Sequence, residues 1–577
     1  MHSPDIFFST EEILIQFGYD SDSEIPEEDM LYLSSLIHEA HSEKDALNIL
    51  SNISIISSED LNKINEFRTL KELEQSDEIT SVLKKLIRSI ILIKKPGING
   101  VIREKITVSN GVRHDLRSSM SYQNYRFSFL FEKDPNELNI FDHVVTNLQG
   151  KARSLQWIVG DFQLEGAYGL IAWRATPVYK GFETIKSISR RGKGLKPYRS
   201  SNEYWSTRGL GVQWSHYGTL ILSLGNTFQD GQLLNGKINI NETGLHITKT
   251  SLIYQNKLRE QSATLLWEKE FSSQQFGFIL NNQNTTQVNK LAKSNFVASV
   301  FGSGKWKNLE WFGENAFQPD QSMAVFSGLK YRLDGMNYLV IYRSYPHGYS
   351  SFRSQPFSEW RRSQEGESGV FQNIYIKGKH YSISIFNDFA QKEKSLIPFG
   401  AISQENGFRW QWSDRRKQWL IQFRQTSKST QTIHYSNEIT PTKNNRITSK
   451  WQYQYKPSAS STIRWQIHTA SDERKKLNGL GIETKVVLKG KYTVTTLSWI
   501  ITYIQDHDGR LYFWGLNLPG EMSSIVVNQN SQQLATRIQV FKKDHYGIYM
   551  RYRIKWFSLK LKGTITKTAA LAIQIKL

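Results

Sequence analysis

Five ionisable side chains near residue 140 form the first group in the chain that could do chemistry. They are Glu132, Asp134, Glu137, Asp142 and His143. Carboxylates at this density supply the oxygen ligands that a divalent cation prefers. However, their spacing matches no known metal-binding loop, and most such clusters are solvated turns. The sequence therefore predicts no metal at this group.

A second group combines two histidines with two glutamates, His38, Glu39, His41 and Glu43, and resembles a helix-borne metal site. The zinc-binding order HExxH is absent, so a surface helix is the better interpretation. The chain has no cysteine, which excludes thiol catalysis and thiolate-bound metals. A GxSxG nucleophile motif is absent too. We therefore expect no catalytic residue, no cofactor and no enzyme activity.

A long basic stretch without strand periodicity covers residues 176–202. Its three glycines, interleaved with cations, could wrap a polyanion such as DNA or a lipopolysaccharide phosphate. The order GxxxxGK[ST] of nucleotide-binding loops is absent. An internal plug and a solvated loop are the alternatives, because loops of this length are usually functional or disordered. The cations that would contact an anion are Lys180, Lys186, Arg190, Arg191, Lys193, Lys196 and Arg199.

The secondary-structure elements that must position these groups are predicted from apolar side chains that recur at every second residue. Between Tyr546 and Trp556 apolar and cationic side chains alternate, as they do in many segments after residue 100. Such alternation indicates β-strands with one apolar and one charged face. Asp334-Gly335, between two alternating segments, is a favoured hairpin turn. At about twenty residues per strand with its connection, the chain predicts roughly 20 to 24 antiparallel strands, within the range of transmembrane β-barrels.

Composition favours a membrane barrel over a soluble β-protein. No apolar run approaches the roughly 18 residues of a spanning helix. Aromatic residues reach 12%, with 16 Trp, as girdles at two membrane interfaces would require. A Lys or Arg on the lipid face costs about 2 to 4 kcal/mol, so the cationic faces must point into the lumen. The expected lumen cations are Arg409, Arg424, Arg464, Arg537, Arg551, Arg553 and Lys555.

Charge divides the chain into two parts. Residues 1–80 carry 19 Asp+Glu against 4 Lys+Arg, a net of −15, and the remainder has a net of +35. This asymmetry marks two bodies with different partners, or with each other as partner. Together with helical periodicity from Met30, it predicts an acidic flexible lead at 1–29, a small all-α domain at 30–93, a linker at 94–100 and the barrel at 101–577.

The helical region resembles a known module. Residues 45–93, DALNILSNISIISSEDLNKINEFRTLKELEQSDEITSVLKKLIRSIILI, are similar to the tandem helix-hairpin-helix module of competence-type DNA receptors. That module stands at the start of a family of bacterial outer-membrane barrel proteins. Residues 129–137 (FLFEKDPNE), 157–174 (WIVGDFQLEGAYGLIAWR) and 503–524 (YIQDHDGRLYFWGLNLPGEMSS) resemble segments of that family. The resemblance implies a fold and a location, without a settled activity.

The hairpin turns of that module offer glycine N–H groups to DNA phosphates. The matching turns here, at Ser51-Asn52 and Ser76-Asp77, contain no glycine, and Asp77 and Glu78 would place two carboxylates beside a phosphate. With a net charge of −15 over residues 1–80, repulsion disfavours DNA. We therefore expect this domain to contact protein instead.

One main functional hypothesis and two alternatives follow. The main hypothesis is a non-enzymatic outer-membrane channel or docking component whose cationic lumen accepts an anionic chain or the protein's own acidic segment. The alternatives are a DNA-binding or DNA-uptake component of the outer membrane, and a soluble nucleic-acid-binding or scaffolding β-protein. The expected partners are outer-membrane lipid, DNA or another polyanion, and periplasmic or outer-membrane proteins, without a small-molecule cofactor. The helical domain would be periplasmic. No signal peptide is visible, so we expect residue 1 to be a processed or mis-assigned start.

Overall fold

The computed structural model describes residues 99–576 apart from short gaps, of which the longest are 174–181, 183–188, 393–400, 432–438 and 558–564. The acidic lead, the helix-hairpin-helix-like domain with its turns at Ser51, Asn52, Ser76 and Asp77, and most of the linker lie outside the described residues. The first strand begins at Asn99, two residues before the expected start of the barrel.

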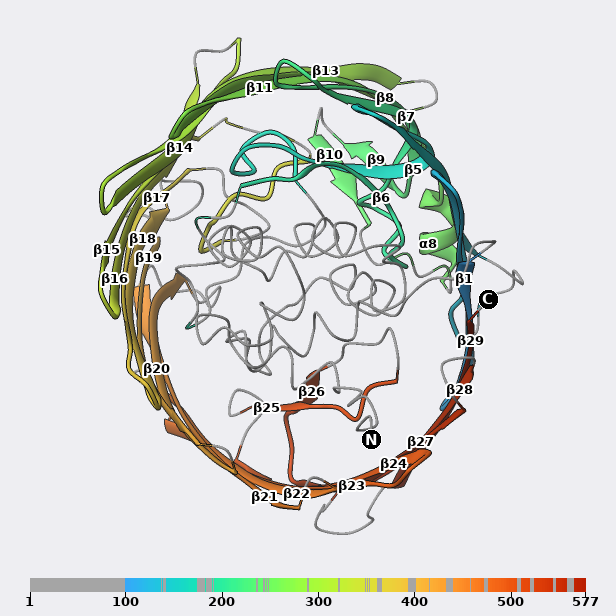
Figure 1. Cartoon of the computed structure of the whole chain (residues 1–577), viewed down its shortest axis with the longest axis vertical. Coiled ribbons are helices and arrows are strands. Elements are labelled where there is room, and N and C mark those ends of the chain that lie inside the picture. Colours follow the sequence, from blue (N-terminus) through green and yellow to red (C-terminus); the bar gives the residue numbers. More distant parts are fainter. Residues whose placement is uncertain are drawn as a thin grey trace.

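Within the described residues, 24 antiparallel strands close into a ring in which the last strand pairs with the first (Figure 1). This result confirms the upper end of the expected strand number. The wall strands are β1 (Asn99–Val108), β2 (Val112–Tyr122), β3 (Tyr125–Lys133), β4 (His143–Ala152), β5 (Leu155–Glu165), β7 (Thr207–Ser215), β8 (Thr219–Gln229), β11 (Leu258–Phe271), β12 (Gln274–Gln287), β13 (Lys290–Trp306), β14 (Leu309–Phe317), β15 (Met323–Leu333), β16 (Met336–Tyr345), β17 (Glu367–Lys377), β18 (Tyr381–Lys392), β19 (Ala401–Ser413), β20 (Lys417–Gln431), β21 (Ile439–Lys456), β22 (Ala459–Ser471), β23 (Lys476–Lys489), β24 (Thr493–Ile504), β27 (Ser531–Lys542), β28 (Tyr546–Phe557) and β29 (Ile565–Lys576).

A few short elements lie inside the ring (Figure 1). The strand β6 continues the sheet inward from β5, and β9 pairs with β10 and β25 with β26 in two small hairpins. Their bounds are β6 (Gly194–Pro197), β9 (Gly231–Leu234), β10 (Lys237–Ile240), α8 (Lys249–Tyr254), β25 (Leu511–Trp514) and β26 (Ser524–Val527). Among the described residues, no helix is long and apolar enough to cross a membrane.

The outer face of the ring is apolar and the inner face is polar. On β24, Leu497 and Trp499 are 41% and 48% exposed, whereas Ser498 and Thr502 between and beyond them are 2% and 5% exposed. A soluble protein would reverse this order, because apolar surface is stable only away from water. The same pattern of exposed Leu, Ile, Phe, Trp and Tyr recurs from β1 to β29. The alternative of a soluble β-protein is therefore wrong.

The two rims of the ring differ in the length of their connections. Turns such as Gln123-Asn124 and Asp334-Gly335 join strands at the rim where β1 begins and β29 ends. The opposite rim carries the connections 166–206, 230–257, 346–366 and 505–530. Outer-membrane barrels have short periplasmic turns and longer extracellular loops. The long connections are therefore extracellular, and the chain enters and leaves the wall on the periplasmic side.

The strand β5 leaves the wall halfway along its length. It pairs with β4 over only six positions, from Ala152↔Leu155 to Asn147↔Gly160, and its last residues pair with β6 inside the ring. Gly160 has φ +103°, and a Cβ there would lie 2.2 Å from the carbonyl oxygen of Thr146. Only glycine suits such a position. The bend carries the chain of connection 166–206 into the lumen.

Side chains bridge the wall where β5 departs. The Asp161 carboxylate accepts the Thr146 backbone N–H at 2.8 Å and the Arg208 Nε–H at 2.9 Å. Arg208 also donates to the Val144 carbonyl oxygen at 2.8 Å. Asp161 and Arg208 thus link β4 to β7 without a complete main-chain ladder.

Candidate functional site in the lumen

The extracellular connections fold back into the ring and form an inner layer, defined here as the described residues of 166–206 and 346–360. Leu170, Ile171 and Trp173 are 0–2% exposed and belong to one apolar core with inward side chains of the wall from β8 to β18. At about 1.5 to 3 kcal/mol for each large apolar side chain removed from water, this core holds the inner layer firmly against the wall.

The two parts of the inner layer also bind each other. The Tyr349 hydroxyl donates to the Leu170 carbonyl oxygen at 2.6 Å, and the Ser351 hydroxyl donates to that of Ile171 at 2.9 Å. The Trp173 backbone N–H donates to the Arg353 carbonyl oxygen at 2.8 Å. Burial raises the pKa of Tyr349, so its hydroxyl keeps its proton. The result is a single packed body on one side of the lumen.

Wall carboxylates satisfy the polar groups of this body. Glu314 on β14 accepts the backbone N–H groups of Tyr168 and Leu170 at 2.9 and 3.1 Å. Within the wall itself, the fully buried Arg343 on β16 donates to Glu367 on β17 at 2.6 Å and to Asp388 on β18 at 2.7 and 3.1 Å. Buried charges are tolerated when they are paired and hydrogen-bonded in this way.

Arg353 fixes the inner layer to the wall on the other flank. Its guanidinium donates to both carboxylate oxygens of Glu260 on β11 at 3.0 Å and to the carbonyl oxygens of Tyr204 and Ser206. Burial lowers the pKa of Arg353, but the charge and hydrogen bonds of Glu260, together with Tyr204 and Tyr198, outweigh burial and raise that pKa overall. Arg353 is thus a structural cation.

The basic stretch 176–202 is only partly described, since Lys180, Lys186 and Arg190 lie outside the described residues. Arg191 forms an ion pair with Glu268 at 3.6 Å, and Lys196 forms one with Glu165 at 3.2 Å. The Lys193 backbone N–H also faces Glu165, at 3.4 Å. Barrel carboxylates therefore contact these groups, an arrangement that suits the plug interpretation of the stretch better than an anion-binding loop.

A pocket on the inner face lies beside the end of this stretch. Arg103, Arg117 and Arg199 line it, together with Asn147 and Tyr198. Arg117 donates to the Asp115 carboxylate at 2.6 to 2.9 Å and to the Arg199 carbonyl oxygen at 3.3 Å. The Asn147 amide donates to the Tyr198 carbonyl oxygen at 2.8 Å. These bonds fasten residues 198 and 199 to the wall between β2 and β4.

The expected lumen cations lie on the strands from β19 to β28. Arg409 is 5% exposed and stands over the ring of Phe182 from the inner layer, 5.5 Å from its centroid. Arg537 and Arg551 are cross-strand neighbours, and they donate to the carbonyl oxygens of Asn517 and Leu516 inside the ring at 2.9 and 3.2 Å. Arg464 is 5% exposed, Arg424 pairs with Glu405, and Arg553 and Lys555 are half-buried.

Buried charges are distributed unevenly around the ring. From β1 to β18, the deeply buried charged side chains of the described residues are ten carboxylates and four cations: Asp115, Glu132, Glu137, Asp161, Glu165, Asp230, Glu260, Glu314, Glu367 and Asp388 against Arg103, Lys105, Lys330 and Arg343. From β19 to β29, they are Glu405 and Glu483 against Arg409, Arg464, Lys485, Arg537 and Arg551. We call these arcs the acidic sector and the cationic sector. Among the described residues, the excess of buried cations that the sequence led us to expect in the lumen is thus restricted to the second arc.

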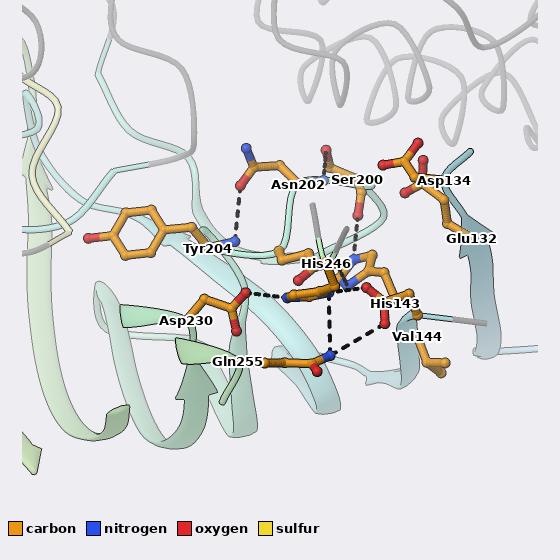
Figure 2. Close-up of polar contacts among 12 residues, drawn as sticks. Glu132, Asp134, His143, Val144, Ser200, Asn202, Tyr204, Asp230, His246 and Gln255 are labelled. Atoms are coloured by element: carbon orange, nitrogen blue, oxygen red, sulfur yellow. Dashed lines mark hydrogen bonds and ion pairs between the residues drawn. The ribbon is translucent and has the colours of Figure 1, made fainter. Parts of the chain in front are cut away.

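A histidine missed by the sequence analysis organises the carboxylates near residue 140 (Figure 2). The His246 ring contacts Asp142 through Nδ1 and Asp230 through Nε2, and its backbone N–H donates to Glu137 at 3.1 Å. His246 stands alone between β10 and α8, so no spacing in the sequence signals its role. Its partners come from the connections after β3 and β8.

The electrostatics of this cluster reflect burial among carboxylates. Burial lowers the pKa of His246, but hydrogen bonds to Asp142 and Asp230 outweigh burial and raise it to about 9. Burial raises the pKa of Glu203 to about 8, against the opposing His246 charge. Burial also raises the pKa of Glu137. At neutral pH these shifts favour a protonated Glu203 and a protonated His246, so the cluster takes up protons instead of standing as separate negative charges.

The remaining members of the expected carboxylate group lie apart from this cluster or at its edge. Arg113 contacts Glu132 and pairs with Asp134 at 3.3 Å. His143 approaches the Ser200 carbonyl oxygen at 3.4 Å (Figure 2). It also lies 3.8 Å from the Glu203 carboxylate. The side chains of Glu132 and Asp134 thus pair with Arg113, whereas Glu137 and Asp142 contact His246 and His143 lies at the edge of the cluster.

The closed ring has an apolar belt on its outer face and ionised side chains on its inner face. This combination indicates a barrel that spans a membrane. Only a closed ring satisfies all strand hydrogen bonds in lipid. The chain is an outer-membrane β-barrel.

No protein-family model matches the chain, and no curated protein matches it. Among solved structures it is similar to the siderophore receptor PirA from Pseudomonas aeruginosa, with 7% identity and a TM-score of 0.42 over 84% of this chain and 82% of that chain. It is also similar to the copper transporter OprC, with 6% identity and a TM-score of 0.44 over 84% and 82%. The FrpB iron transporter from Neisseria meningitidis gives 7% identity and a TM-score of 0.38 over the same shares. At such low identities and TM-scores, the substrates of those proteins cannot be assigned to this chain.

Proposed function

We propose that the chain is a non-enzymatic channel or docking component of the outer membrane whose cationic sector accepts an anionic chain. Rings of about 16 to 18 strands enclose an aqueous channel, and rings of about 22 strands hold a plugged lumen. A 24-strand ring is wider still. The observation that carries the proposal is the sector of buried cations from β19 to β29, which faces a lumen that the inner layer fills from the other side.

The nearest anionic chain is the acidic N-terminal part of the same protein. Residues 1–80 have a net charge of −15 against +35 for the rest. The chain enters the wall at the periplasmic rim, so this part is tethered beside the lumen. Opposite charges at this ratio attract at low salt, and the attraction weakens as the Debye length falls from about 30 Å at 0.01 M to about 3 Å at 1 M.

Conductance of the full chain in planar bilayers tests the proposal. Under a KCl gradient we expect an anion-selective reversal potential, because fixed cations enrich anions in the lumen. Neutralising Arg537 and Arg551 together with Gln should shift the reversal potential toward zero. The matched control is Lys307→Gln, which removes an exposed cation at a periplasmic turn. Cation selectivity of the unaltered protein would refute the proposal.

The tethered acidic chain is tested separately. Replacing Asp20, Asp22, Glu24, Glu27, Glu28 and Asp29 with the matching amides leaves the barrel unchanged and removes six negative charges. We expect a larger conductance at low salt and convergence with the unaltered protein at high salt. Equal conductance of the variant and the unaltered protein at every salt concentration would show that the acidic N-terminal part does not bind the cationic sector.

DNA uptake is not supported by the described residues. Two of the described cations of the stretch 176–202 pair with barrel carboxylates, Arg191 with Glu268 and Lys196 with Glu165. We therefore do not propose DNA as the anionic chain.

A further inference from the structure

His246 lies where three extracellular connections meet. Asp142 ends the connection between β3 and β4, Glu203 belongs to the connection 166–206, and Asp230 and His246 belong to the connection 230–257. The side chains of His246, Asp142 and Asp230 are 3–5% exposed. A buried imidazole surrounded by carboxylates from separate loops is a set of potential metal ligands. Solvated loops would not require such burial.

The two nitrogens of the imidazole have different surroundings. On the Nδ1 side, the Gln255 amide donates to Asp142 Oδ1 at 3.4 Å and approaches Nδ1 at 3.3 Å (Figure 2). That side contains a donor, which would repel a cation. The Asp230 carboxylate contacts Nε2, and one carboxylate oxygen each of Glu203 and Asp230 lies within 4.8 Å of the other and of a nitrogen of the His246 ring. Asp230 accepts the Asn256 backbone N–H through Oδ1 at 2.8 Å and turns Oδ2 toward Nε2, so Oδ2 is the oxygen that a ligand would use.

The fourth carboxylate of the cluster is already occupied. Glu137 accepts the His246 backbone N–H at 3.1 Å through one oxygen and the Asp134 backbone N–H at 3.0 Å through the other. Its role is to shape the loop that presents His246. The carboxylates left for a ligand on the Nε2 side are therefore those of Glu203 and Asp230.

A glycine makes room for Glu203 beside this loop. Gly244, with φ +62°, stands against the Glu203 side chain, and a Cβ there would lie 2.8 Å from the carboxyl carbon and 3.1 Å from Oε1. A larger residue would push the Glu203 carboxylate away from His246. Within the described residues, Glu203 and Asp230 form ion pairs with imidazoles and with no Lys or Arg. No Lys or Arg of the described residues therefore competes with a metal ion for these two carboxylates.

We propose that Glu203, Asp230 and Nε2 of His246 bind one divalent first-row transition-metal ion, which fastens the three connections to one another. Imidazole with carboxylates suits Zn²⁺ or Fe²⁺, whereas Ca²⁺ and Mg²⁺ prefer oxygen ligands alone. Asp142 holds the Nδ1–H and thereby orients the ring, as carboxylates do behind metal-bound histidines. On binding, Nε2 of His246 and the Glu203 carboxyl release their protons to solvent, and the lone pairs that held them form bonds to the metal. Glu203, 25% exposed, gives the ion a way in.

The test is a Zn²⁺ titration of the full chain in detergent after removal of metals with EDTA, followed by isothermal calorimetry and by metal analysis after desalting. We expect one equivalent of Zn²⁺ to remain bound. His246→Gln and Glu203→Gln should remove this equivalent. Asp142→Asn should weaken binding about 10- to 100-fold, because it removes only the group that orients the ring.

A matched control uses another histidine–carboxylate pair. His114 Nε2 lies 3.0 Å from Glu104 Oε1 on the hairpin of β1 and β2, outside the cluster, and His114→Gln should leave Zn²⁺ binding unchanged. Heat-modifiable migration in SDS confirms that each variant still forms the barrel. The proposal is overturned if the unaltered protein retains no Zn²⁺, if His246→Gln retains as much as the unaltered protein, or if Ca²⁺ displaces Zn²⁺ at equal concentration.

Discussion

The acidic and cationic sectors are built from the same wall and differ in what their inward charges contact. In the acidic sector, Arg343 and Arg353 are enclosed by Glu367, Asp388 and Glu260, and wall carboxylates also bind the backbone of the inner layer. In the cationic sector, Arg537 and Arg551 face each other across two strands and reach carbonyl oxygens. One arc uses charge to build a packed body, and the other holds an excess of cations over carboxylates.

This difference explains why only one arc is a candidate for binding an anion. A buried cation enclosed by carboxylates has little remaining field, whereas neighbouring cations add their fields in the lumen. Stability should therefore depend on charge in the acidic sector, and ion selectivity should depend on charge in the cationic sector.

Replacing one arginine in each sector gives the largest expected contrast. Arg343→Met would leave Glu367 and Asp388 buried without their cation, and we expect a loss of about 3 to 5 kcal/mol in the free energy of unfolding. Arg551→Met removes a hydrogen bond to a carbonyl oxygen and relieves repulsion with Arg537, so we expect a loss of about 1 kcal/mol. Urea unfolding in micelles followed by Trp fluorescence measures both. Equal losses would show that the two sectors do not differ in this way.

Replacing one carboxylate in each sector should give an effect of intermediate size. Glu314→Gln turns one acceptor of the Tyr168 and Leu170 N–H groups into a donor, and we expect a loss of about 1 to 3 kcal/mol with faster amide exchange at those two residues. The control is Glu483→Gln in the cationic sector, where the carboxylate accepts the Ser498 hydroxyl at 3.2 Å. Unchanged exchange at residues 168 and 170 would mean that Glu314 does not hold the inner layer.

The smallest effect is expected outside both sectors. Arg332 and Glu310 form an ion pair of 2.6 Å near the periplasmic rim, with side chains 24% and 29% exposed. Water and salt screen such a pair, so Glu310→Gln should cost less than about 1 kcal/mol. A loss as large as that of Arg343→Met would show that burial is not what separates the sectors.

The wall could be predicted from the sequence because its signal is local. Alternation of apolar and polar side chains gives strands, and Asp334-Gly335 gives a turn, which β15 and β16 confirm with the pair Leu333↔Met336. The cost of a charge in lipid requires Arg409 and Arg551 to avoid the lipid face. These inferences need no knowledge of distant contacts.

The inner layer and the His246 cluster could not be predicted because their contacts are distant in sequence. Asp142 and His246 are 104 residues apart, and Tyr349 reaches Leu170 across 179 residues. The inward carboxylates Glu314, Glu367 and Asp388 alternate with outward side chains as regularly as the cations do. The prediction for the lumen rests only on the cations of the strands, so it does not reveal the acidic sector. Their partners become visible only after the connections have folded into the ring.

The departure of β5 from the wall sets the mechanical limit of the barrel. The ladder between β4 and β5 has six residue pairs, whereas the one between β20 and β21 has fifteen. Toward the extracellular rim the circumference is closed by the Asp161 and Arg208 side chains, which can exchange partners with water without breaking a strand. Under lateral tension we expect the cylinder to unzip first along this short ladder, from its extracellular end.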